Sequence, residues 1–369
     1  MLVTCVLATS ACTADAPPSQ SASASVTAEQ ILVDDAALLQ VSPVDYEGAG
    51  LLVATFSDAA KGRTVELQRR TAEGWEKVES GKQDANGTVE FRKTVPGADT
   101  FRAVAQAADG EPATATAEAS AAQQWTEAFT SEFEDDALKP GAWGHRSLDI
   151  FDAFGRHCAA PHAESVGFAD GAVQLAVTEE KESAQVAKAK AAGCKERRVF
   201  KNAMISTEGL FKVKAGTLAA RIKFAEGQGM HGAVWLQSYD KSEIDMIESY
   251  GYGVGLTSVI HVDGQRYPTD GGDTYVIADT VTDRDWWSKY HTYSVEWDNE
   301  SVVFRVDGKV SKRIAHATPD TEYFIVASML SSDWEQKRFK NPVDNAEGVT
   351  PTTLPQTMSV DWIKVWTPA

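Results

Sequence analysis

The chain has 369 residues, of which 43% are hydrophobic, so it is long enough for two globular domains with sizeable cores. Its 53 acidic and 35 basic residues give a formal net charge of −18. Nucleic acids and anionic membranes bind proteins through clustered Lys and Arg, which excludes both as expected partners.

Residues 1–30 are predicted to be a leader and a disordered tail. An apolar run rich in small residues ends at Cys12, and a Ser/Ala/Pro/Thr stretch of low complexity follows. The run is too short to span a membrane and lacks a basic first segment, so we expect the true start upstream of Met1. Residues 9–12 resemble a bacterial lipobox. We therefore expect either a secreted protein or a lipoprotein on the bacterial cell surface, with Cys12 acylated.

Residues 31–118 are predicted to form a small β-sandwich of the immunoglobulin or fibronectin kind. Strand-like runs at 51–56, 64–69, 88–91 and 100–105 are separated by turn signals, including Asn86-Gly87. Such short, evenly spaced strands are typical of this sandwich. Trp75 is a candidate for stacking on a sugar, although a single Trp at a strand start more often packs against its neighbours. We find no catalytic grouping in this segment.

An Ala/Ser/Gln-rich linker, residues 119–124, leads to a second domain at residues 125–369. Strand signals dominate this domain, and Asp307-Gly308 predicts the turn of a hairpin whose first strand is 302–306. The Ala-rich stretch 179–190 is expected to be a short helix or a mobile loop. Many strands and few helices favour a two-sheet jelly roll whose concave face can hold an extended polymer.

Two cysteines remain for the mature protein once Cys5 and Cys12 are assigned to the leader. Cys158 and Cys194 form an even pair that can bridge in an oxidising compartment. We expect a disulfide between them. The alternative is a pair of buried free thiols.

The most informative stretch is residues 242–250, which contains Glu243, Asp245 and Glu248. Ile244, Met246 and Ile247 between these acids suit a strand packed on a core. Side chains alternate on a regular strand, so Glu248 would face away from the other two acids. A β-bulge at Met246-Ile247 restores the parity and places the three carboxylates on one cleft wall.

Three clustered carboxylates have a use in catalysis. Like charges and partial desolvation raise one pKa, so one carboxyl can act as general acid while another stays ionised as nucleophile, with the outer pair ~5–5.5 Å apart. The alternative is a solvated acidic strand face, because a short acidic string in an acidic chain is by itself a weak motif.

The segments around the motif carry a resemblance to a known family. Residues 243–248 resemble the bulged catalytic signature of glycoside hydrolase family 16, which includes laminarinases, agarases and carrageenases. Further segments similar to the family in kind and order are 205–209, 216–223, 227–236, 293–297, 305–308 and 360–366. His231-Gly232 stands where many laminarinases have Trp-Pro, and Asp240-Lys241-Ser242 precedes Glu243 where a Trp-Pro is common. The sugar subsites are therefore expected to differ.

The resemblance implies the roles of the acids. Glu243 would be the nucleophile, Glu248 the general acid/base, and Asp245 the partner that orients and tunes Glu243. It also implies an all-β, concanavalin A-like jelly roll and a retaining, endo-acting hydrolase, with β-1,3- or mixed-linkage glucan as the favoured polysaccharide. Some members of the family hold a structural Ca²⁺, for which Glu132 and Asp361 are candidate ligands here.

Sugar binding needs flat apolar faces, and Trp235 and Trp334 are the predicted platforms, with core packing as the alternative. His261 lies on the predicted strand after the catalytic one. It would contact the acids or the substrate, or else be a satisfied core histidine.

Other chemistries lack support. The histidines form no H-E-x-x-H motif and the cysteines no paired spacing, so we expect no catalytic metal and no cofactor beyond a possible structural Ca²⁺. We expect a monomer. Three functions stay open: a polysaccharide hydrolase, a transglycosylase on the same site, and a lectin-like binding protein, against which the acids at Glu243 and Glu248 argue.

Overall fold

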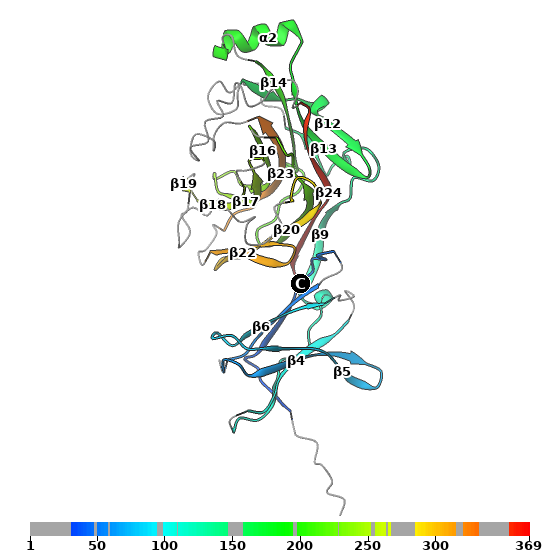
Figure 1. Cartoon of the computed structure of the whole chain (residues 1–369), viewed down its shortest axis with the longest axis vertical. Coiled ribbons are helices and arrows are strands. Elements are labelled where there is room, and N and C mark those ends of the chain that lie inside the picture. The colour runs from blue at the N-terminus through cyan, green and yellow to red at the C-terminus, as the bar shows by residue number, and fades with distance from the viewer. Residues whose placement is uncertain are drawn as a thin grey trace, which may run out of the picture.

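The computed structural model describes residues 31–47, 50–57, 60–93, 99–108, 110–146, 158–194, 198–227, 229–251, 255–262, 265–266, 285–314, 320–331 and 354–369. The predicted leader lies outside these ranges. Strands β1 to β8 gather at one end of the molecule, and the strands from β9 onward form the larger body at the other end (Figure 1). No helix in the described ranges is both long enough and apolar enough to cross a bilayer.

The N-terminal part consists of two sheets that share one core. The five-stranded sheet has the order β1-β8-β7-β4-β5, and the three-stranded sheet has the order β2-β3-β6. Leu67 and Phe101 of the first sheet and Leu52 and Phe91 of the second belong to the same buried cluster. Its elements are β1 (Leu32–Val33), β2 (Leu38–Val41), β3 (Gly50–Thr55), β4 (Thr64–Thr71), β5 (Gly74–Lys82), β6 (Thr88–Lys93), β7 (Phe101–Ala105) and β8 (Thr114–Ala115).

The four predicted strands of this part correspond to β3, β4, β6 and β7, while β1, β2, β5 and β8 were not predicted. The immunoglobulin-like assignment stays a prediction. Trp75 packs within the part, because the guanidinium of Arg102 lies 4.3 Å and that of Arg70 5.1 Å from its ring centroid. This agrees with the packing interpretation.

The predicted linker contains an ordered turn of helix, α1 (Ala121–Gln124). The Gln124 side chain donates to the carbonyl oxygen of Leu39 and accepts from the amide of Val41. Trp125 also donates its indole hydrogen to the Val41 carbonyl, at 3.0 Å. These bonds to β2 tie the connection to the N-terminal part.

The larger body is a two-layer jelly-roll sandwich, which confirms the predicted fold class. One hydrogen-bonded path, β19-β18-β17-β16-β23-β14-β13-β24-β15-β20-β21-β22, runs through both layers. We call β19 to β14 on this path the cleft layer and β13 to β22 the back layer. Val234 and Ile244 of the cleft layer and Leu218 and Val360 of the back layer belong to one buried core.

The elements of this body are β9 (Trp125–Ser131), β10 (Gly144–His145), β11 (Ala159–Pro161), η1 (Ala163–Ser165), β12 (Val166–Ala169), β13 (Ala172–Glu179), α2 (Ser183–Ala189), η2 (Lys190–Cys194), β14 (Phe200–Ser206), β15 (Gly216–Lys223), β16 (Met230–Gln237), β17 (Glu243–Ser249), β18 (Leu256–Val262), β19 (Gln265–Arg266), β20 (His291–Trp297), β21 (Val302–Val306), β22 (Lys309–Ile314), β23 (Phe324–Ser331) and β24 (Gln356–Pro368). Strand β24 pairs with β13, β15 and β9 in the back layer.

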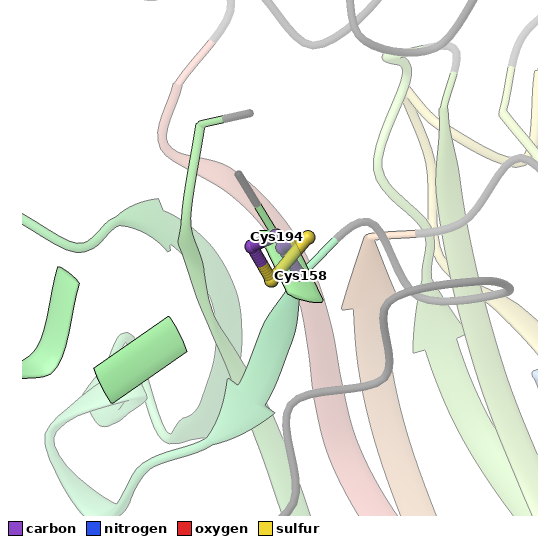
Figure 2. The surroundings of a disulfide bond; sticks show 2 residues. All are labelled: Cys158 and Cys194. Atoms are coloured by element: carbon purple, nitrogen blue, oxygen red, sulfur yellow. A yellow bond between two sulfur atoms is a disulfide. The ribbon is translucent and has the colours of Figure 1, made fainter. Parts of the chain in front are cut away.

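Three local predictions in this body can be compared with the structure. Asp307 and Gly308 form the two-residue turn between β21 and β22, with φ of 48° and 75°. Stretch 179–190 contains the helix α2. Cys158 and Cys194 are bridged, with Cα atoms 5.6 Å apart (Figure 2), which confirms the predicted disulfide. The bridge is buried together with Ala160, Ala189 and Val199.

The N-terminal part docks on the back layer. Tyr46, 5% exposed, lies in a buried cluster with Val44, Leu51 and Ala219, and Trp362 and Trp366 pack against this cluster. The Tyr46 hydroxyl is 2.8 Å from Ser294 Oγ in a buried hydrogen bond. At the edge, the carboxylate of Glu47 is 3.4 Å from the guanidinium of Arg221. Apolar burial therefore dominates this contact, because exposed ion pairs contribute little.

Tyr46→Ala is expected to lower the free energy of unfolding by about 3–5 kcal/mol, because it leaves a cavity between the two parts. Tyr46→Phe removes only the hydroxyl and is expected to cost about 0.5–1.5 kcal/mol. Urea unfolding followed by tryptophan fluorescence measures both values. Equal losses in the two variants would contradict the packing role of the ring.

Candidate active site

Strand β17 contains the predicted β-bulge. Its register with β18 shifts between Asp245 and Glu248, so Met246 and Ile247 together lie opposite Ser258. Both bulge side chains are 1% exposed and belong to the core. Ser258 Oγ donates a 2.7 Å hydrogen bond to the Met246 carbonyl oxygen, which satisfies a backbone acceptor within the irregular pairing. The structure thus confirms the bulge.

The bulge puts Glu243, Asp245 and Glu248 on the face of the sheet opposite the core. Asp245 and Glu248 are buried, while the Glu243 side chain is 28% exposed. Their cross-strand neighbours on β16 are Gln237, Trp235 and Ala233 in that order. The acids therefore form one row on the cleft layer, beside a second row on β16 that includes Trp235.

Glu243 and Asp245 are coupled carboxylates with a histidine beside them. His261 Nε2 is 3.4 Å from Asp245 Oδ2 and 4.0 Å from Glu243 Oε1. Burial first, and then the charge and hydrogen bond of Asp245, raise the pKa of Glu243 to about 9, while His261 acts in the opposite direction. The pair therefore shares one proton at neutral pH.

Glu248 has two hydrogen-bonding neighbours on one oxygen. Its Oε1 is 2.7 Å from His231 Nε2 and accepts a 3.0 Å hydrogen bond from the Tyr250 hydroxyl. The rings of His231 and Tyr250 stack, with centroids 4.6 Å apart and planes 22° from parallel. All three residues are buried. The carboxyl group is therefore held in one orientation.

A cavity of ≈ 430 Å³ opens beside Glu243. Its lining includes Arg146, Gln237, Tyr239, His261 and Phe324. The Arg146 guanidinium lies 5.7 Å from the ring centroid of Phe324 and 5.9 Å from that of Trp235. The cavity thus combines aromatic faces with a cation, an amide and carboxylates, a set that suits a polyhydroxylated ligand.

Two groups of side chains in the described ranges bring three ligand atoms within metal-binding reach: His162, Glu164 and Glu180, and the catalytic candidates Glu243, Asp245 and His261. In the first group, Lys201 Nζ lies 2.6 Å from Glu164 and lowers the pKa of that carboxyl. The ammonium group of Lys201 already neutralises part of the Glu164 charge, so less negative charge is left to bind a metal ion.

The predicted Ca²⁺ ligands make ion pairs. Glu132 lies 2.7 Å from Lys364 Nζ, and Asp361 lies 2.7 Å from Arg221 Nη1. An ion bound between them would have to replace both cations, so the geometry gives this ligand set no support. Calcium binding elsewhere in the chain stays a prediction.

The structure brings most of the predicted site residues together. Glu243, Asp245, Glu248, Trp235 and His261 all lie on the cleft layer. Trp334 falls outside the described residues. The sequence analysis did not predict two further residues of the cavity lining, the exposed aromatic ring of Tyr239 and the cation of Arg146.

His231 is the main residue that the sequence analysis missed. On a strand at 230–237 it shares a face with Ala233 and Trp235, because the three positions differ by two residues each. That parity was readable from the sequence. The identity of its partner was not, since the contact with Glu248 depends on the cross-strand register and on the bulge.

The fold and this row of acids define a carbohydrate-active enzyme of the jelly-roll class. Residues 165–364, which make up more than half of the chain, match the glycosyl hydrolases family 16. The chain therefore belongs to glycosyl hydrolase family 16.

Curated relatives match over part of their length. The chain is 26% identical over 193 residues to the "Glucan endo-1,3-beta-glucosidase A1" of Niallia circulans, covering 45% of this chain and 26% of that protein. It is 28% identical over 160 residues to the "Crh-like protein CRH11" of Candida albicans, covering 42% and 34%. The chain thus spans only about a quarter to a third of these relatives.

Solved structures support the fold. SCLam, described as a non-specific endo-beta-1,3(4)-glucanase, aligns with a TM-score of 0.52 at 17% identity, over 66% of this chain and 92% of that one. The laminarinase of Rhodothermus marinus aligns with a TM-score of 0.51 at 16% identity, over 66% and 98%. At such identities the likeness concerns the jelly-roll sandwich alone.

Glu243→Gln is expected to change how stability depends on pH. The raised pKa means that the folded protein keeps a proton between about pH 5 and 9 that the unfolded chain releases, so wild-type stability falls as pH rises. The variant lacks this titration, and its melting temperature should exceed that of the wild type by more at about pH 9 than at about pH 5. Calorimetry at both pH values, with the exposed Glu226→Gln as control, tests this; parallel curves would contradict it.

Proposed function

We propose that the protein is an endo-acting β-glucan hydrolase that retains the configuration of the anomeric carbon. The row of Glu243, Asp245 and Glu248 on the cleft layer carries the proposal. Glu248 is close enough for its charge to contribute to the raised pKa of Glu243. Retaining glycosidases use two carboxyl groups ~5–5.5 Å apart beside the scissile bond.

The two acids would act in sequence. Glu243 attacks the anomeric carbon while the bond from that carbon to the leaving oxygen breaks, and Glu248 gives its proton to that oxygen. Glu248 then takes a proton from water, and the water oxygen displaces Glu243 from the anomeric carbon. Asp245 holds the proton of the coupled pair in the first step, so that Glu243 attacks as a carboxylate.

A neutral glucan with β-1,3 or mixed linkages is the proposed substrate. Three carboxylates in the cleft and a net charge of −18 disfavour sulfated galactans. The 26%-identical relative from Niallia circulans is a glucan endo-1,3-beta-glucosidase, which supports this choice. Trp235, which is partly buried, and Tyr239, which is exposed in the cavity lining, offer rings for the apolar faces of the sugars.

We further propose that the protein is exported, either secreted or anchored at the cell surface by a lipid on Cys12. The buried Cys158–Cys194 bridge supports an oxidising location, because such bridges are rare in reducing compartments.

The wild-type protein is expected to release short oligosaccharides from laminarin or lichenan and little from agarose or carrageenan. Glu243→Gln should lower kcat by about 10⁴-fold or more, since the loss of a covalent nucleophile removes the first step. Reducing-sugar and product-length assays measure both. Glu226→Gln, far less buried and outside the site, should keep wild-type activity.

Two results would contradict the hydrolase proposal. Glucan binding without cleavage by the wild type would indicate a lectin-like protein. Products longer than the starting oligosaccharide would indicate that a sugar hydroxyl replaces water in the second step, and therefore a transglycosylase.

The stereochemistry of the products provides an independent test. Retention means that the β-anomer is the first product and that the α-anomer follows only by mutarotation. Proton NMR of a laminari-oligosaccharide digest in the first minutes distinguishes the two anomers. An initial α-anomer would contradict the double-displacement mechanism.

A further inference from the structure

We propose that His231 positions the general acid/base Glu248, by donating a hydrogen bond from Nε2 to Oε1 so that the transferable proton resides on Oε2. The proposal rests on the proposed function of Glu248. His231 would be a positioning residue, because it acts on the substrate only through that carboxyl group.

Two hydrogen-bonding contacts at Glu248 Oε1 favour this arrangement. Oε1 is 2.7 Å from His231 Nε2 and 3.0 Å from the Tyr250 hydroxyl, which donates to it. With a hydrogen on Nε2, Oε1 accepts twice and its lone pairs are occupied. The carboxyl proton then belongs on the other oxygen, Oε2. An Nε2 without hydrogen would instead accept the proton of Glu248 and withdraw it from the leaving oxygen.

The same donors fit both states of the carboxyl group. A protonated Glu248 accepts both bonds on the carbonyl oxygen, and an ionised Glu248 accepts them more strongly, since hydrogen bonds to a charged acceptor are stronger. The donors therefore favour departure of the proton without having to reorient. Such preorganisation is what a group needs if it must alternate between acid and base.

The surroundings keep the His231 ring in place. Its strand, β16, is paired on both sides, with β17 and with β23, and His231 itself lies opposite Leu330. The ring stacks on Tyr250, and both residues are buried. The next residue, Gly232, packs so closely that an added Cβ would come within 3.0 Å of Phe224. Little freedom remains for the imidazole to leave Glu248.

Three substitutions separate the hydrogen bond from the packing. His231→Phe keeps a ring against Tyr250 and removes the donor. His231→Gln restores an N–H near the position of Nε2 without the ring. Tyr250→Phe removes the second donor and keeps the stack. His162→Phe, on a histidine outside the cleft, is the matched control.

The enzyme would be assayed on laminarin or lichenan and on a 2,4-dinitrophenyl β-glucoside oligomer. The dinitrophenolate leaves without a proton, so only the natural glucan requires the acid. We expect His231→Phe to lower kcat/KM about tenfold to a hundredfold on the glucan and less than about threefold on the aryl glycoside. His231→Gln should recover part of the loss. The alkaline limb of the glucan pH profile should move upward in His231→Phe, because a donor to the carboxylate form is lost.

Equal losses on both substrates with an unmoved pH profile would overturn the proposal and leave His231 a packing residue. A second readout does not need activity. Nitrogen-15 NMR of histidine-labelled protein reports the tautomer, and the His231 signal is the one absent from His231→Phe. We expect a hydrogen on Nε2; a hydrogen on Nδ1 alone would overturn the proposal. If the wild type cleaves neither substrate, the hydrolase function fails, while the tautomer still decides whether His231 donates to Glu248.

Discussion

The site depends on one irregularity in one strand, the bulge at Met246 and Ile247. Burying an aliphatic side chain stabilises a fold by about 1.5–3 kcal/mol, and burying an unpaired carboxylate costs several kcal/mol. In a regular strand that kept Glu243 and Asp245 in the cleft, Ile247 would leave the core and Glu248 would enter it. The bulge removes this conflict, because two successive apolar residues can both face the core while the next acid returns to the cleft. The same core that closes the sandwich therefore holds the acids in register.

The two outer acids of the row have different surroundings, although they come from one strand. Burial first, and then the charge of the neighbouring carboxylate Asp245, raise the pKa of Glu243. Glu248 instead has two hydrogen-bonding groups on Oε1, His231 and the hydroxyl of Tyr250. Burial and a neighbouring charge therefore tune Glu243, while hydrogen bonds orient Glu248. Such a division lets two chemically identical carboxyl groups take different roles.

The sequence analysis predicted the structural features that depend on the residue pattern within one short segment. The acids and apolar residues of 243–248 predicted a bulge at Met246 and Ile247, and the strand-like run 302–306 followed by Asp307-Gly308 predicted a hairpin. Strand β5 was missed because nearly all its side chains are half-buried or exposed, so no apolar alternation marks it. His231 was missed for another reason. Its role depends on which residue lies across the strand, and no spacing within one segment encodes that.

The contact between the two parts of the molecule also depends on residues far apart in the sequence, so it could not be predicted from a local pattern. Tyr46 and Ser294 are 248 positions apart and neither stands in a recognisable motif. Their contact places the N-terminal part against strands β15, β20 and β24 of the back layer, across the shared core from the acids. The described lining of the cavity beside Glu243 comes entirely from residues between Arg146 and Phe324. For the described residues, the N-terminal part can therefore influence this lining through the packing of the back layer and the core, because a densely packed core transmits strain.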